Sequence, residues 1–351
     1  MSLPAPLRGR GSATNPKNRF ESIECVPEPA EDSDETCSPH TQFFPDRSKS
    51  IIAYNDSPDV GFDASVNPYR GCEHGCVYCY ARPSHEYLGF SAGLDFETKI
   101  MVKEDAPELL RKELSSPKWK PQLVALSGNT DCYQPAEKHK QLTRRCLQVL
   151  LEFRNPVVIV TKNHLVTRDI DILAELARYD CIGVTLSLTT LDHKLSSLLE
   201  PRASRPARRL AAIRALADAG VPVGYLQAPM IPGLTDAEAP AIGVAAARAG
   251  ATFSGYVALR LPFAVKDLFE QWLDQHYPEK KDKILNRIRE IRSGKLNDPN
   301  FKTRMRGEGI YAEQMAKLFE LARKKSGIGE RWPKLTTEHF RRLGKDQLRL
   351  F

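Results

Sequence analysis

The 351-residue sequence predicts an α/β fold: a partial (β/α)6 barrel of the TIM type, with a disordered N-terminal leader and a C-terminal helical extension. Between Ser65 and Leu261, short apolar runs alternate with amphipathic stretches six times. This alternation is typical of parallel strands joined by right-handed helical crossovers. Beyond Leu261 only helical patterns remain. Six units are too few for a closed eight-stranded barrel, so we expect a partial one.

The expected elements follow from the periodicity of apolar residues. Strands are expected at residues 65–70, 122–127, 156–161, 182–188, 221–228 and 252–261. Helices are expected at residues 106–114, 137–153, 168–179, 206–219 and 236–249. The third strand contains Val157-Val158-Ile159-Val160, which is continuously apolar, so burial on both faces is expected.

The chain divides into four segments by composition. Residues 1–40 are rich in Pro, Ser, Glu and Asp and predict a disordered acidic leader. Residues 41–262 form the predicted partial barrel. Residues 263–330 form the helical extension, with helices expected at residues 266–276, 280–293 and 309–325. Residues 331–351 form a basic tail with six Lys/Arg and two Asp/Glu.

Charge is unevenly distributed along the chain. The whole sequence carries a formal net charge of +7, but residues 1–60 hold six Lys/Arg and ten Asp/Glu, so the remainder carries +11. A basic body indicates nucleic acid or another polyanion as a partner. A solvated basic surface with no such partner explains the charge equally well.

Two classes of protein are excluded by simple patterns. The sequence has no apolar run near the roughly 18–20 residues that a membrane span needs. The basic start has no apolar segment behind it, so a secretory signal is not expected. We therefore expect a cytoplasmic protein, in whose reducing environment the eight cysteines do not form a disulfide framework.

The most informative segment holds three cysteines spaced C-x3-C-x2-C. Cys72, Cys76 and Cys79 directly follow the first strand, in a loop that Gly71 and Gly75 allow to curl. Thiolates at this spacing can converge on one inorganic centre. Three ligands for a cluster of four irons leave one iron open to bind and activate another molecule.

A zinc site is the alternative for this loop. Structural zinc normally takes four protein ligands, and the fourth would have to be His74, His85 or Cys132. The spacing favours the iron–sulfur cluster. Three cysteines within eight residues between glycines are also a poor fit to plain core packing.

Three stretches resemble the radical S-adenosylmethionine (radical SAM) superfamily, in its spore photoproduct lyase-like or DNA repair photolyase-like branch. They are Asn67-Pro68-Tyr69-Arg70-Gly71-Cys72, Cys76-Val77-Tyr78-Cys79-Tyr80-Ala81-Arg82 and Gly128-Asn129-Thr130-Asp131-Cys132-Tyr133-Gln134-Pro135. The resemblance covers residues 41–325. It implies an enzyme whose [4Fe-4S] cluster, held by Cys72, Cys76 and Cys79, cleaves S-adenosylmethionine reductively and abstracts hydrogen from a substrate.

The same resemblance implies partners. Reductive cleavage needs an electron donor such as flavodoxin or ferredoxin. The branch implies lyase chemistry in DNA repair, with a damaged or modified DNA base as substrate. Radical modification of RNA, a peptide or a small molecule is the alternative, because kinship of fold does not determine a substrate. A non-catalytic, zinc-stabilised nucleic-acid-binding protein is the alternative from another class.

Polar residues at the carboxyl ends of the expected strands are candidates for binding S-adenosylmethionine, since barrel sites gather there. By the resemblance, Asp131 or the backbone of residues 127–130, including Ser127, receives the methionine amino group. A helix N-cap by Thr130 or Asp131 is the structural alternative. Ser187 is the candidate for the ribose.

For the methionine carboxylate the resemblance favours Arg202, with Lys162 as the second candidate. The structural alternative for Arg202 is an ion pair with Glu200. Tyr78 is expected to form an aromatic wall for adenine, together with backbone groups of residues 228–236, and plain core packing is its alternative.

Two more residues are candidates for catalysis. Cys132 and Tyr133 follow the second-strand loop and are expected to face the barrel mouth. A thiol and a phenol there can relay a hydrogen atom to a substrate radical.

The chain ends in Gln347-Leu348-Arg349-Leu350-Phe351. This pattern resembles the short peptide by which bacterial repair and replication proteins bind the DNA sliding clamp. Leu348, Leu350 and Phe351 would enter an apolar groove, and Gln347 would hydrogen-bond at its edge. A tail that folds back over its own core is an equal alternative.

Overall fold

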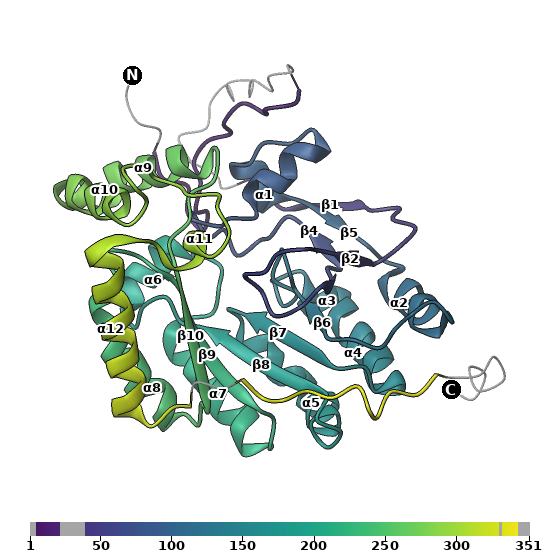
Figure 1. Cartoon of the computed structure of the whole chain (residues 1–351). Helices are drawn as coiled ribbons and strands as arrows, with labels where there is room; N and C mark the ends of the chain where they lie inside the picture. The colour runs from purple at the N-terminus through teal and green to yellow at the C-terminus, as the bar shows by residue number, and fades with distance from the viewer. Residues whose placement is uncertain (1–4, 22–38, 330–331, 343–351) are drawn as a thin grey trace.

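A seven-stranded sheet forms the centre of the structure, a computed structural model that describes residues 5–21, 39–329 and 332–342 (Figure 1). Its order is β10-β9-β8-β7-β6-β3-β2, and every neighbouring pair is parallel except β2 with β3. The strands are β2 (Ile52–Tyr54), β3 (Ala64–Val66), β6 (Val124–Leu126), β7 (Val157–Thr161), β8 (Ile182–Ser187), β9 (Val223–Met230) and β10 (Phe253–Ala258). The six parallel strands confirm the predicted fold class.

Helices connect successive parallel strands. They are α2 (Ala106–Ser115), α4 (Leu142–Phe153), α5 (Ile170–Ala177), α7 (Pro206–Asp218) and α8 (Ala239–Arg248). Shorter segments lead into some of them: α3 (Glu137–Lys140), η2 (His164–Asp169), α6 (His193–Leu199) and η3 (Asp236–Glu238). Each long helix buries one face; in α7 the buried positions recur at helical spacing, which packs that face against β8 and β9.

A second, three-stranded sheet was not predicted from the sequence. It has the order β1-β5-β4, with β1 (Gln42–Pro45), β5 (Lys99–Val102) and β4 (Tyr69–Arg70). The short helices η1 (Arg82–Leu88) and α1 (Leu94–Thr98) accompany it. Strands of two to four residues are too short to show a periodic pattern. The loop with the three cysteines lies between β4 and η1.

The third parallel strand differs from its prediction. Along β7, buried and half-buried residues alternate, and the half-buried Val158 and Val160 line a cavity. The expectation that both faces are packed is therefore wrong, because one face of β7 faces the hollow interior of the open barrel. By contrast, every residue of β8 is buried.

The helical extension follows β10. It consists of α9 (Val265–His276), η4 (Pro278–Lys280), α10 (Lys281–Glu290), α11 (Thr303–Arg306) and α12 (Gly309–Ser326). Helix α12 lies alongside α8 (Figure 1). Its Phe319 contacts Tyr256 of β10, with ring centroids 4.9 Å apart. The extension thus covers the β10 edge of the sheet.

The N-terminal leader is not disordered throughout. The buried Glu97 carboxylate accepts hydrogen bonds from the backbone N–H groups of Gly11 (3.0 Å) and Ser12 (2.9 Å), and Arg19 pairs with Glu86 at 2.8 Å. The prediction of disorder over residues 1–40 is therefore wrong for residues 5–21. Composition showed few apolar residues there, and these contacts are made by backbone and charged groups.

Residues 332–342 cross the beginnings of the parallel strands. The Thr336 N–H donates to the Asp180 carbonyl (3.0 Å), and the Arg341 N–H donates to the Phe153 carbonyl (2.9 Å). This part of the basic tail therefore packs on the barrel. The clamp-like residues Gln347, Leu348, Leu350 and Phe351 lie outside the described residues. Within the described chain, no helix has the length and apolarity to cross a membrane.

Candidate active site

The three clustered cysteines lie in one buried loop. Within the described residues Cys72, Cys76 and Cys79 are free thiols, the first two buried and the third partly exposed. The loop is closed by hydrogen bonds from the Cys79 N–H to the Cys76 carbonyl (3.2 Å) and from the Cys72 N–H to the Phe96 carbonyl (2.9 Å). Burial raises the pKa of all three thiols, so a cation must replace their protons before they act as ligands.

Two glycines shape this loop as expected. Gly71 and Gly75 have φ values of +80° and +67°, which glycine adopts without strain. A Cβ on Gly75 would lie 2.6 Å from a Glu97 carboxylate oxygen, and one on Gly11 would lie 1.7 Å from the Gly75 carbonyl oxygen. The N-terminal segment therefore rests directly on the cysteine loop.

All three candidates for a fourth zinc ligand are buried. His74 lies between Asp131 and Asn163, His85 Nε2 lies 2.9 Å from the Lys99 carbonyl, and Cys132 is in the main core. Across the described residues, no group of three His, Cys, Asp or Glu side chains is arranged to hold a single metal ion. The donor set of three thiols in one loop fits a cluster with an open iron better than a four-ligand zinc site.

Lys162 and Ser187 meet at the carboxyl ends of β7 and β8. The Lys162 ammonium donates to Ser187 Oγ (2.5 Å) and to the Ala228 carbonyl (2.8 Å). Ser187 Oγ also donates to Ala228 (2.9 Å). The structure therefore brings together two of the residues predicted to bind S-adenosylmethionine, at the barrel end where ligands bind.

A buried carboxylate that the sequence analysis did not select lies beside them. Glu200 pairs with Arg209, and Lys162 Nζ lies 3.4 Å from it. Burial alone would raise the pKa of Glu200, but the two cations hold it well below its ordinary value. The set holds two cations and one anion, so one positive charge is in excess. A ligand carboxylate would balance it.

Asp131 already has partners for both of its carboxylate oxygens. One accepts from Thr161 Oγ1 (2.8 Å) and from the Tyr133 N–H (2.9 Å), and the other from the Lys162 N–H (2.8 Å). Burial acts to raise the pKa of Asp131, but His74 at 3.3 Å and these donors lower it. Asp131 thus orients the loop rather than capping a helix, which leaves the backbone of residues 127–130 as the alternative for the amino group.

Ser127 adopts a positive φ of +84° at the end of β6. Its Oγ accepts from the Cys132 N–H (2.8 Å) and donates to the Val160 carbonyl (3.4 Å). Ser127 therefore ties the start of the loop of residues 128–135 to Cys132 and to β7.

Arg202 lies on the cysteine loop rather than beside Lys162. Its guanidinium pairs with Glu73 (3.0 Å), between Cys72 and Cys76, and donates to Thr41 Oγ1 (3.1 Å). The alternative pair of Arg202 with Glu200 is therefore wrong, because Arg209 already occupies that carboxylate.

Tyr78 and the segment after β9 come together as predicted. The Tyr78 ring packs in the same apolar cluster as Ile231, and its hydroxyl donates to Glu200. Thr189 Oγ1 lies 3.2 Å from the same hydroxyl. The Tyr78 hydroxyl is therefore bound to the charged set, while its role beside adenine stays a prediction.

Cys132 and Tyr133 do not face the barrel mouth. Both are buried in the main core, and the Tyr133 hydroxyl donates to Asp169 (3.1 Å). Asp169 in turn pairs with Arg144 and Arg168. The expected orientation is wrong because both side chains pack in the main core; their catalytic role stays a prediction.

One signal in the sequence could have identified the buried charge set. Arg209 lies on the face of α7 that otherwise buries Pro206, Ala212, Ile213 and Leu216. A cation at a core position requires a buried anion as partner. The sequence alone did not indicate that Glu200 is that anion.

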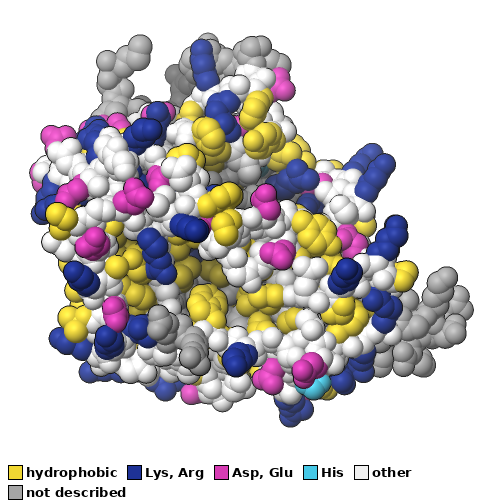
Figure 2. Space-filling view, viewed as in Figure 1, with side chains coloured by type: hydrophobic (Ala, Val, Ile, Leu, Met, Phe, Trp, Pro, Cys, Tyr) yellow, Lys and Arg dark blue, Asp and Glu magenta, His cyan; other side chains and the backbone are white. Residues whose placement is uncertain are grey.

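A cavity of about 1240 Å³ lies inside the open barrel. It is lined by apolar residues of β7, β9 and β10 and by the region around α11 and α12. Figure 2 shows a hollow on this face with hydrophobic side chains inside and Lys and Arg side chains beside it. The cavity exceeds the roughly 300–1,000 Å³ of most small-molecule sites, so it can hold a large substrate group.

The chain is similar in sequence to known proteins. The sequence profile of the Radical SAM superfamily matches residues 66–242. An uncharacterized protein of Mycobacterium tuberculosis is 38% identical over 261 residues, which cover 72% of this chain and 75% of that protein. An uncharacterized protein of Methanocaldococcus jannaschii is 28% identical over 222 residues, 63% of this chain and 79% of the relative.

The fold is also similar to solved structures of spore photoproduct lyase. The complex with a dinucleoside spore photoproduct matches with a TM-score of 0.56 and 17% identity, covering 81% of this chain and 78% of that one. A mutant with bound AdoMet and the same dinucleoside matches with a TM-score of 0.53 and 17% identity, covering 83% and 80%.

Proposed function

The chain belongs to the radical SAM superfamily, and on that basis we propose that it abstracts hydrogen from a damaged or modified base in DNA. It is an enzyme, and its cofactors are those of the superfamily: a [4Fe-4S] cluster and S-adenosylmethionine. When bound, these cofactors supply a 5′-deoxyadenosyl radical by one-electron reductive cleavage, for which an electron donor such as flavodoxin or ferredoxin is needed. The non-catalytic zinc protein is thereby set aside.

Cys72, Cys76 and Cys79 are the proposed cluster ligands. They are the only three cysteines that share one loop of the described chain, and that loop is buried, curled by glycines and covered by residues 11–12. The fold shields Cys72 and Cys76 from water, and Cys79 is partly exposed. The residues around the loop also hold it in place, since Arg202 and Gln134 bind Glu73 within the loop.

The proposed S-adenosylmethionine site is argued from the charge balance at the ends of the strands. Lys162, Arg209 and Glu200 together carry one excess positive charge. We propose that Lys162 binds the methionine carboxylate. Ser187 Oγ lies 2.5 Å from Lys162 Nζ and is proposed to contact the ribose. Tyr78 is proposed to lie against adenine, with its hydroxyl held by Glu200.

Two observations support DNA as the substrate. The chain after residue 60 carries a net charge of +11, which favours a polyanion. Spore photoproduct lyase, solved with a dinucleoside photoproduct, shares the fold. RNA, a peptide or a small molecule is the alternative substrate, and the experiment below separates them. The C-terminal residues 347–351 are proposed to bind the sliding clamp, which would bring the enzyme to DNA.

Anaerobic reconstitution tests the enzyme assignment. We expect about four irons and four sulfides per chain, and 5′-deoxyadenosine after reduction with dithionite. Cys76→Ala should abolish both, whereas Cys181→Ala, at a buried cysteine before β8, should change neither. Full cleavage activity in Cys76→Ala would contradict the cluster assignment.

Product analysis tests the substrate. Reduced enzyme is incubated with DNA that carries defined lesions, and with RNA and peptide pools as comparison. Conversion of a DNA base supports the proposal. Turnover of RNA or peptide with no change in any DNA would overturn it.

A further inference from the structure

Two arginines near one end of the cavity form no ion pair within the described chain. Arg306 ends α11 and lines the cavity, and Arg260 lies two residues after the end of β10. Met305, which lines the cavity, lies between them: its sulfur is 3.7 Å from Arg260 Nη1, and Arg306 is its neighbour in sequence. Two unbalanced cations at one edge form a site for anions.

Nearby arginines show the contrast. Arg304 pairs with Asp59, and Arg292 donates to the carbonyls of Ala258 (3.3 Å) and Leu259 (2.7 Å). Arg304 thus ties α11 to Asp59, and Arg292 donates to the backbone at the end of β10, although the Arg292 Nε also lacks a hydrogen-bond partner among the described residues. Arg260 and Arg306 are not used in this way.

Arg260 is partly desolvated, which makes its lack of a partner costly. Its Nε is buried without a hydrogen-bond partner among the described residues. Burial, followed by the nearby Arg304, lowers the pKa of Arg260. A bound anion would relieve both the burial cost and the repulsion.

The position of Arg260 links the cavity to the cysteine loop. Its guanidinium lies 5.4 Å from the ring centroid of Tyr80, the residue after Cys79. The Tyr80 hydroxyl donates to the Gly128 carbonyl (3.0 Å) at the end of β6. An anion on Arg260 would therefore lie at the edge between the cluster loop and the cavity.

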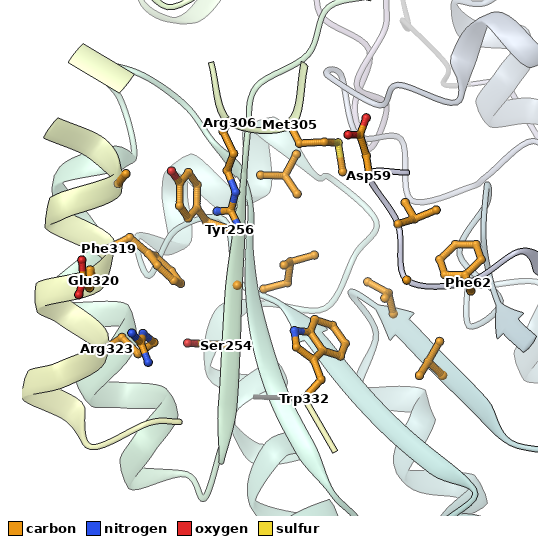
Figure 3. A pocket seen from close by; sticks show the side chains of 18 of the residues that line it. Asp59, Phe62, Ser254, Tyr256, Met305, Arg306, Phe319, Glu320, Arg323 and Trp332 are labelled. Atoms are coloured by element: carbon orange, nitrogen blue, oxygen red, sulfur yellow. The ribbon is translucent and has the colours of Figure 1, made fainter. Parts of the chain in front are cut away.

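The cavity beside this edge suits a flat aromatic group. The Arg306 guanidinium lies 4.0 Å from the ring centroid of Tyr256, and Figure 3 shows Met305 and Arg306 at one end of the cavity and Trp332 further in. Aromatic and arginine side chains of this kind stack on nucleobases. Of the four acids that line the cavity, Asp59 pairs with Arg304 and Glu320 with Lys324, whereas Glu308 and Glu313 form no ion pair within the described residues.

We propose that Arg260 and Arg306 bind a backbone phosphate of a DNA strand whose adjacent base enters the cavity. This inference rests on the proposed function and deepens it, because it names the residues that hold the substrate. The phosphate would fix the position of the nucleotide, while the aromatic lining receives the base. Since each contact is an ionic one to phosphate, binding should depend on salt.

DNA with uncharged backbone linkages tests the contact between the two arginines and the phosphate directly. The reconstituted enzyme is titrated anaerobically, by fluorescence anisotropy, with a single-stranded DNA oligonucleotide and with versions carrying one uncharged methylphosphonate at successive positions. For wild type we expect one position at which the neutral linkage weakens binding about tenfold, the size of a charge-assisted contact. The double variant Arg260→Met/Arg306→Met should bind all versions alike, with the salt slope reduced by about 0.7, the value for one phosphate contact on a single strand.

Controls separate charge from folding. Arg178→Met removes an exposed arginine from the end of α5 and should keep the tenfold effect. Arg260→Lys keeps the charge and should retain part of it. The melting temperatures of the variants should not fall below that of wild type, because neither Arg260 nor Arg306 forms an ion pair within the described residues.

The outcomes also separate this inference from the proposed reaction. A linkage effect that disappears in the double variant supports the phosphate site, even if no base is converted, in which case only the proposed reaction fails. Wild type that tolerates every neutral linkage, or a double variant that keeps the effect, overturns the site. The same effect with an RNA strand and no binding of DNA overturns the assignment to DNA.

Discussion

Replacing Lys162 with Met removes the excess positive charge proposed to bind the methionine carboxylate. Glu200 keeps Arg209 as its partner, so the variant leaves a balanced buried pair. Hydrogen bonds to charged groups contribute about 1.5–3 kcal/mol. Loss of the contact should therefore weaken S-adenosylmethionine binding about 10- to 150-fold.

Decarboxylated S-adenosylmethionine isolates this contact. Binding of both ligands to the reconstituted protein is measured by anaerobic calorimetry. Wild type should prefer the carboxylated ligand by the factor above, and Lys162→Met should bind the two almost equally. Lys194→Met, at an exposed position of α6, is the matched control and should behave as wild type. If Lys162→Met keeps the preference and Arg202→Met loses it, the reasoning from charge balance is wrong and Arg202 binds the carboxylate.

Three further predictions concern stability and docking. Glu200→Gln leaves the buried Arg209 and the half-buried Lys162 without an anion and should lower the free energy of unfolding by about 3–5 kcal/mol in chemical denaturation, against almost no change for the exposed Glu279→Gln; a loss below 1 kcal/mol would refute the buried set. Burial lowers the pKa of His85 to about 4, so the fold favours the neutral ring: stability should be complete above about pH 6.5 and fall by roughly 3 kcal/mol as the pH drops to 4. His85→Gln, which keeps a donor for the Lys99 carbonyl, should flatten this part of the stability profile, and an unchanged slope would show that other groups cause it. A chain ending at Asp346 should lose binding to purified sliding clamp in a pull-down, and equal capture of both chains would remove the docking proposal.

The elements that a local pattern encodes were predictable from the sequence. The six parallel strands and the cysteine loop depend on short-range periodicity and spacing, and the structure shows both. What lies on each side of a strand depends on the whole fold. The sequence predicted that Val158 and Val160 are core residues, yet they line the cavity because the barrel is open there.

Partners of charged groups were the least predictable feature. Arg202 and Glu200 are close in sequence, but the turn after α6 sends them to different partners, Glu73 and Arg209. Only the burial pattern of α7 indicated that Arg209 needs a buried anion as its partner. The ordered leader was missed because Gly11 and Ser12 are held by backbone hydrogen bonds, which leave no trace in composition.

Deuterium transfer tests the central claim most directly. The reduced enzyme is given S-adenosylmethionine and lesion-bearing DNA deuterated in its nucleosides, and the 5′-deoxyadenosine and S-adenosylmethionine pools are analysed by mass spectrometry. A radical enzyme that acts on a DNA base should move deuterium into these pools, and Cys76→Ala should not. Cleavage of S-adenosylmethionine with no deuterium from any DNA would contradict DNA as the substrate, and no cleavage at all would contradict the proposed site.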